Sequence, residues 1–226
     1  MRQRRERPGV RLWAGVLWMA VVQSFLVQGL VQARWTLPYS LVRDPISDLG
    51  ATTCTPLVCS PWHALMNASF VALGLCMAAG ALAAEWSSPR VLPLSRVAAA
   101  LLILSGAGVV VVGLVPENTS HLGHTIGAAA GIVFGNVGTL LTGLTLRRAR
   151  GLPVAGGIGV GAGVVGLLAT LLLAAIEFHT VPSLQVIEGL GERLAVYPIL
   201  VAVIVAGNAL VAGDWRREPR GRTNRR

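Results

Sequence analysis

Charged residues are scarce in this chain. Only 13% of its 226 residues are Asp, Glu, Lys or Arg, while 54% are hydrophobic. A soluble domain of this size needs more polar surface to stay in solution, so the soluble globular class is excluded. Lysine is absent altogether, and every basic side chain is an arginine. Together with the abundance of Ala, Gly and Val, this indicates the codon bias of a GC-rich bacterial genome.

Common catalytic motifs are absent as well. The sequence contains no Gly-x-Ser-x-Gly, no His-Glu-x-x-His and no phosphate-cradling glycine loop. The sequence alone therefore does not decide whether the protein is an enzyme.

Long apolar runs, by contrast, are plentiful. A helix that crosses a bilayer takes roughly 17 to 25 mostly apolar residues. Six such runs occur without a charge in their central parts, at about 10–32, 62–84, 97–115, 122–146, 153–176 and 194–213. The first run is longer than the roughly 7–15 residues of a signal-peptide core, so it predicts a retained helix. The predicted fold is all-α: a six-helix transmembrane bundle over residues 10–213, with a long first outer loop.

The arginines are distributed unevenly between the two predicted sides. Sixteen of the 19 basic residues fall in segments 1–11, 85–96, 147–152 and 214–226. By the positive-inside rule, residues 1–9 form a basic cytoplasmic N-terminus and residues 214–226 an Arg-rich cytoplasmic tail. The net charge of +9 then indicates attraction to anionic lipid headgroups rather than nucleic-acid binding. A multi-pass protein of the bacterial plasma membrane is predicted.

Polar residues gather at the opposite, outer ends of the predicted helices. All four histidines and six of the ten acidic residues lie there: His63, His121, His124, His179, Asp44, Asp48, Glu117, Glu177, Glu188 and Glu192.

Two of these histidines raise the question of a metal site. His121 and His124 are three residues apart, so both can point to one face of the fourth helix. With His179 and Asp48 they offer the imidazole and carboxylate ligands that zinc prefers. The alternative is that the histidines are interfacial polar residues, and that Glu117 with residues 118–120 forms an ordinary N-cap.

The first outer loop is long for a compact bundle, and such loops tend to be functional. Cys54 and Cys59 lie in it on the oxidising side, which predicts a small disulfide. Ser47 and Asp48 can cap a short helix in this loop. Near the last helix, Arg193 is predicted to form an ion pair with Asp44 or Asp48.

Glycines are spaced four apart in two helices. Gly123, Gly127, Gly131 and Gly135 form one row, and Gly157, Gly159, Gly161 and Gly163 form two overlapping pairs. In lipid such small-residue rows let helices approach closely, so both helices are predicted to pack through their glycines.

Several segments together resemble a known family. They are ISDLGATTC, VCSPWHALMNASF, VGLVPENTSHLGHTIGA, FGNVG and GERLAVYP. In these the chain resembles the DUF998 family of bacterial and archaeal membrane proteins, which carries no established activity. The resemblance covers essentially the whole chain. It implies importance for Ser47, Asp48, Asn67, Pro116, Glu117, His124, Asn136, Glu192 and Arg193.

Three functions compete. The default hypothesis is a non-catalytic envelope protein that binds membrane lipid, a partner protein or a second copy of itself through the outer face. Its binding residues are predicted to be Ser47, Asp48, Asn67, Glu192 and Arg193. The alternative is a membrane-embedded hydrolase of a lipid or lipid-linked substrate, with or without a metal, using Asp48, Glu117 and His124. The third is a small-solute transporter, although ionisable midplane residues and an internal repeat are both lacking.

Overall fold

The computed structural model describes residues 7–87, 93–148 and 152–212. Its elements are α1 (Pro8–Ala20), α2 (Gln23–Gln32), the 3-10 helix η1 (Ser47–Gly50), α3 (His63–Ser87), α4 (Pro93–Leu114), α5 (His121–Arg148), α6 (Pro153–Glu177), the 3-10 helix η2 (Pro182–Ile187) and α7 (Glu188–Ala212). The described residues contain six helices, with α1 and α2 taken together, that are long and apolar enough to cross a membrane. The all-α fold with six candidate spans is therefore confirmed. The predicted tail and most of the basic N-terminus lie outside the described residues.

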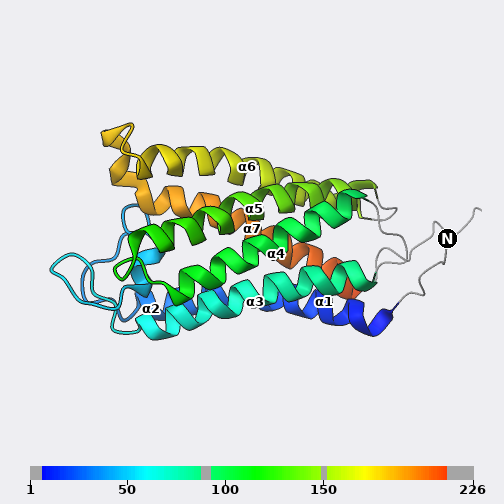
Figure 1. Cartoon of the computed structure of the whole chain (residues 1–226), viewed down its shortest axis with the longest axis horizontal. Coiled ribbons are helices and arrows are strands. Elements are labelled where there is room, and N and C mark those ends of the chain that lie inside the picture. Colours follow the sequence, from blue (N-terminus) through cyan, green and yellow to red (C-terminus); the bar gives the residue numbers. More distant parts are fainter. Residues whose placement is uncertain (1–6, 88–92, 149–151, 213–226) are drawn as a thin grey trace, which may run out of the picture.

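The helices form a closed ring in chain order. From α3 to α7 each long helix packs against the one before it, α1 packs against α3, and α7 returns to contact α1. The long loop 33–62, η2 and the turn between α4 and α5 lie together at one end of the bundle, shown at the left of Figure 1. The start of α1 and the end of α7 lie at the other end.

The last helix begins earlier than predicted. It starts at Glu188 rather than near residue 194, so Glu192 and Arg193 are helical rather than part of a loop. The predicted span began after Glu192 and Arg193 because only uncharged apolar runs were counted. In the structure both side chains form hydrogen bonds with the first loop. The acidic Glu188 in the first turn also suits the positive end of the helix dipole.

The first span is one stretch of helix interrupted by a tight turn. At Val21 and Val22 the hydrogen bonds run three residues back instead of four, for example from Ser24 N to Val21 O. The Ser24 hydroxyl donates to that same carbonyl at 2.9 Å. A serine that bonds back onto its own helix is a known cause of such bends. The bend separates α1 from α2 within the predicted 10–32 span.

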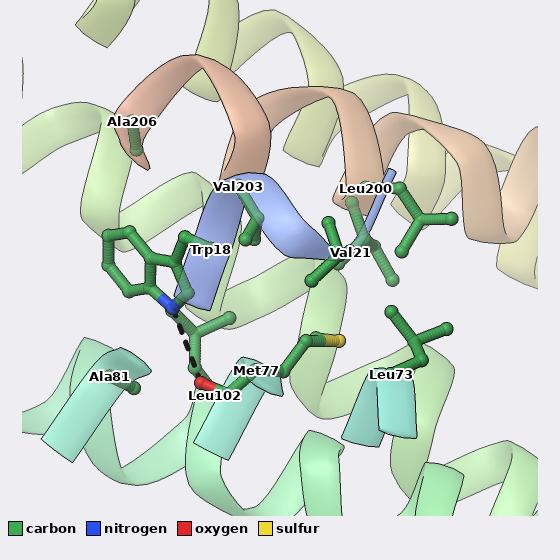
Figure 2. Packing of buried hydrophobic residues seen from close by; sticks show 10 residues of the cluster. Trp18, Val21, Leu73, Met77, Ala81, Leu102, Leu200, Val203 and Ala206 are labelled. Atoms are coloured by element: carbon green, nitrogen blue, oxygen red, sulfur yellow. Dashed lines mark hydrogen bonds between the residues drawn. The ribbon is translucent and has the colours of Figure 1, made fainter. Parts of the chain in front are cut away.

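Trp18 organises the apolar core near the end away from the long loop. Its indole N–H donates to the carbonyl of Met77 at 3.3 Å, which joins α1 to α3 (Figure 2). Around the ring lie Val203 and Ala206 of α7 and Ala81 of α3. A buried Trp is costly unless its N–H is satisfied, so this bond fixes how the first, second and last spans meet.

The glycine prediction is confirmed for three of the four glycines on α5 and for two of the four on α6. Gly127, Gly131 and Gly135 lie close against neighbouring helices, whereas Gly123 faces the turn before its own helix. On α6, Gly159 and Gly163 pack against α5, but Gly157 and Gly161 have nothing near them. These four glycines lie on two faces of α6, because residues two apart point about 200° from each other on a helix.

One buried amide ties three helices together. Asn136 of α5 is fully buried. Its Nδ2 donates to Ile132 O at 3.0 Å, to Ala195 O of α7 at 2.9 Å and to Thr170 Oγ1 of α6 at 3.3 Å. A Cβ at Gly166 would overlap with the oxygen of this amide. Gly166 is therefore the position on α6 that leaves space for the junction.

We expect Gly166→Ala to lower the free energy of unfolding by about 1–3 kcal/mol, because an added methyl group overpacks a site whose amide is held in place. Gly157→Ala on the same helix is the matched control and should leave stability unchanged or slightly raised. Chemical denaturation of the purified protein in detergent measures both. Equal losses in the two variants would contradict this role of Gly166.

Candidate functional site

The polar groups predicted to be outer do lie at one end of the molecule. We call this the polar end, and define it by His63, His121, His124, His179, Asp44, Asp48, Glu117, Glu177, Glu188 and Glu192. They come from the loop 33–62, the start of α3, the turn between α4 and α5, the start of α5, the end of α6 with the residues after it, and the start of α7. Elements far apart in the sequence thus bring together all four histidines and six of the ten acidic residues.

Arg193 holds the first loop against α7. Its side chain is 5% exposed. Nη1 donates to the carbonyl oxygens of Leu41, Asp44 and Gly189 at 3.0, 2.8 and 2.8 Å, and Nη2 donates to the Tyr39 hydroxyl at 2.6 Å. The predicted ion pair with the Asp44 or Asp48 carboxylate is wrong. The guanidinium instead satisfies backbone carbonyls of a loop that lacks regular secondary structure.

Glu192 secures the same loop from the neighbouring position. One of its carboxylate oxygens accepts a hydrogen bond from the backbone N–H of Ile46, just before η1. The predicted short helix is present, but neither Ser47 nor Asp48 caps it with a side chain. A glutamate 146 residues further along the chain supplies the acceptor at that helix start. Ser47 itself is half-buried as the first residue of η1.

The backbone of the loop also meets the start of α7 directly. Gly189 N donates to Arg43 O at 3.1 Å, and Leu190 N donates to Val42 O at 2.9 Å. These are first-turn N–H groups that a helix cannot satisfy internally. A Cβ at Gly189 would overlap with the carbonyl of Asp44. Only glycine lets the loop approach this closely.

The far half of the loop is fixed to α3 and to the turn between α4 and α5. Asn67 Nδ2 donates to Gly50 O at 2.9 Å, and the Ser60 hydroxyl donates to Leu49 O at 2.7 Å. Asn118 Oδ1 accepts from Thr52 N at 3.0 Å. Asn67, predicted as a binding residue, thus positions η1.

A disulfide closes a short turn within the far half of the loop 33–62. Cys54 and Cys59 are bonded in the structure. Cys76 is a free, half-buried thiol on α3.

The two histidines of α5 do not share a face. His121 is exposed and lies 3.6 Å from a Glu117 oxygen and 3.4 Å from a Glu177 oxygen. His124 is 6% exposed, and its Nδ1 is 2.9 Å from the carbonyl of Val115. Three residues advance a helix by about 300°, and here that difference separates a surface side chain from a buried one.

The proposed metal ligands are not brought together. His179 is exposed, and its Nδ1 contacts the carbonyl of Glu177 at 2.9 Å. In the parts of the chain that the structure describes, no three His, Cys, Asp or Glu side chains are grouped so as to hold a metal ion. The shell of His121, His124, His179 and Asp48 is therefore not formed.

The start of α5 is capped by Ser120, the last residue of the predicted N-cap run 117–120. The Ser120 hydroxyl accepts from Gly123 N at 3.3 Å. Pro116 begins this turn, and its carbonyl accepts hydrogen bonds from Thr119 N at 2.9 Å and from the Thr119 hydroxyl at 2.7 Å. Glu117 contacts His121 at 3.6 Å instead.

Asp48 lies among like charges. Burial, and after it the nearby carboxylates of Glu117, Glu188 and Asp44, together raise the pKa of its carboxyl to about 7. An aspartate in such a place carries its proton until near neutral pH. Of the three predicted catalytic residues, Asp48 and Glu117 are near each other, whereas His124 is turned into the protein.

An internal cavity of about 60 Å³ lies beneath η1. Its wall is mostly apolar and is made by α2, α3, α4, α5 and α7, together with Ile46 of the first loop. The polar wall groups are Gln28, Ser105, His124 and Glu192. Glu192 is half-buried and lies in the wall of this cavity.

The comparisons with known proteins agree with the motifs. The chain matches the family described as protein of unknown function, DUF998, over residues 13–209. It belongs to the DUF998 family. No curated protein and no solved structure matches it. The DUF998 match runs from α1 to α7 and so includes the loop, the polar end and the cavity.

Three residues of this DUF998 site were missed as site residues. Gln28 and Tyr39 belong to no motif or spacing pattern in the sequence, and Tyr197 gives no spacing signal although it lies in GERLAVYP. Tyr39 binds Arg193, and the Tyr197 hydroxyl donates to Gln28 Oε1 at 2.7 Å. The available signal was composition: these are the only two tyrosines in the chain, and a buried tyrosine needs a partner for its hydroxyl.

We expect Asp48→Asn to stabilise the protein at high pH and to have little effect at low pH. The folded pKa of about 7 lies above the ordinary 3.8, so the folded state binds this proton more tightly. The associated stability is complete below the unfolded pKa and is lost as pH rises through about 7. Between about pH 4 and about pH 8, the melting temperature of the variant should rise progressively above that of the wild type. Glu85→Gln, near the C-terminal end of α3, is the control and should show no such trend. If the melting temperatures of Asp48→Asn and wild type change in parallel with pH, the raised pKa of Asp48 is refuted.

We expect Arg193→Met to release the first loop. The change removes the guanidinium donor from the carbonyls of Leu41 and Asp44 and from the Tyr39 hydroxyl, at a cost of about 3 kcal/mol or more. Amide hydrogen exchange over residues 39–50 should accelerate by at least tenfold. Arg43→Met removes an exposed arginine from the same loop and serves as control. Unchanged protection in Arg193→Met would show that the loop is held by other contacts.

Proposed function

We propose that this DUF998 protein is a multi-pass protein of the bacterial plasma membrane that binds a membrane lipid at its polar end. Both termini are cytoplasmic in this proposal, and the polar end faces outward. The arginine distribution supports the orientation, since the start of α1 and the Arg-bearing end of α5 lie at the end opposite the long loop.

One observation carries the lipid-binding proposal: a mostly apolar cavity lies directly beneath a polar end and has polar groups in its wall. Concave, apolar sites with a few converging polar groups are the usual form of small-molecule sites. In a membrane protein, an amphiphile is the ligand that matches an apolar wall with a polar margin. The clamped loop over the cavity gives such a site a fixed shape.

A lipid hydrolase is the second candidate. The observation in its favour is that a buried imidazole, His124, and a carboxylate, Glu192, line one cavity. An imidazole held by one nitrogen has the other available as a general base. Incubation of the purified protein with ester- and amide-linked lipids, followed by mass spectrometry, tests this candidate; products absent from a His124→Ala preparation would establish hydrolysis.

We expect lipid to copurify with the protein and to be lost when the cavity is filled. Ala128 of α5 lines the cavity, whereas Ala129 beside it is exposed. Ala128→Leu should therefore reduce retained lipid by at least tenfold, and Ala129→Leu should not. Quantitative mass spectrometry of lipids in matched detergent preparations measures this. Equal retention in both variants would mean that any bound lipid is only annular, and the proposal would fail.

A further inference from the structure

The cavity beneath η1 contains a buried imidazole with one unused nitrogen. His124 Nδ1 lies 2.9 Å from the carbonyl oxygen of Val115. A carbonyl only accepts hydrogen bonds, so in the neutral ring Nδ1 carries the proton and Nε2 is an acceptor. Among the described residues Nε2 has no hydrogen-bond partner. The side chain is more than nine-tenths buried and borders the cavity.

Gln28 presents the complementary group to the same cavity. Its side chain is 4% exposed, and its Oε1 accepts from the Tyr197 hydroxyl at 2.7 Å. Because Gln28 Oε1 accepts the Tyr197 proton, the amide N–H₂ is the end of the side chain that remains. No described residue accepts a hydrogen bond from it.

These two groups define the chemistry of a polar ligand head. A hydroxyl both donates and accepts, so it satisfies the His124 acceptor and the Gln28 donor together. A carboxylate or phosphate only accepts and would also face the Glu192 carboxylate in the cavity wall. An ammonium only donates, so it would leave the Gln28 amide N–H₂ without an acceptor in a mostly apolar site.

The size of the cavity limits what it encloses. An engineered cavity of about 150 Å³ holds one benzene molecule. A cavity of about 60 Å³ encloses a hydroxyl and the first few carbons of a chain, and no complete lipid.

We propose that this cavity is a binding site for the hydroxyl end of a lipid alcohol, with His124 Nε2 as acceptor and the Gln28 amide as donor. The proposal rests on the proposed lipid-binding function and specifies its ligand class. Lipids with anionic heads bind elsewhere on the molecule or only annularly.

Photolabelling of the full-length protein in detergent tests the proposal. Octanol, octylamine and octanoate, each with a diazirine on the chain, are compared at equal concentration, and labelled peptides are mapped by mass spectrometry. Octanol should label cavity-wall residues such as Phe70, Met77 and Ile199. Unlabelled octanol should compete, and octanoate and octylamine should label the wall at least about fivefold less, the factor expected for one mismatched hydrogen bond. Equal labelling by octanoate or by octylamine would overturn the assignment of the head.

Variants separate the cavity from the rest of the surface. Ala128→Leu should abolish wall labelling, and Ala129→Leu should retain it. His124→Phe should reduce octanol labelling about fivefold, while His121→Phe should not. Octanol labelling that survives Ala128→Leu would overturn the site. If lipid copurifies with wild-type protein and octanol still fails to label the wall, the lipid-alcohol site is refuted while lipid binding stands; if both are missing, both proposals fall.

Discussion

The arrangement of the polar end depends on one buried guanidinium. Arg193 donates hydrogen bonds to the carbonyls of Leu41 and Asp44 and to the Tyr39 hydroxyl, so a loop without regular structure becomes part of the folded core. Arginine suits this task because its planar fork offers five donors and keeps its charge. The neighbouring Glu192 accepts a hydrogen bond from the backbone N–H of Ile46. Two adjacent residues of α7 therefore hold both the loop and the start of η1.

The cavity follows from this clamp. Ile46, held by Glu192, contributes to its wall, and Tyr197, near Arg193, orients Gln28 within it. The half-buried carboxylates around Asp48 lie outside this apolar space and face one another instead. The molecule therefore separates an acidic outer margin from a nearly uncharged interior, and this separation favours an uncharged ligand head inside.

Hydropathy alone was enough to predict the six spans, because an apolar run of about 20 residues has few other uses. The motifs around ISDLG and GERLAVYP also predicted the family correctly. Residue pairing was beyond the sequence. Their spacing of three residues predicted that His121 and His124 share a face of the helix, but one is exposed and the other buried. Arg193 binds backbone carbonyls rather than the expected carboxylates. Every residue has a backbone carbonyl, so the sequence does not indicate which carbonyls an arginine will bind. These partners become known only from the path of the loop. The start of α7 was predicted too late for a similar reason, because its first turns contain charged residues but are still helical.

The clamp also imposes an order on biosynthesis. A chain leaves the ribosome from its N-terminus, so the loop 33–62 is made long before α7 exists. During that interval the Leu41 carbonyl lacks the donor that Arg193 supplies in the folded protein, and the wall of the cavity is incomplete. The polar end is thus completed last, by a helix that must insert beside α1, the first span to enter the bilayer.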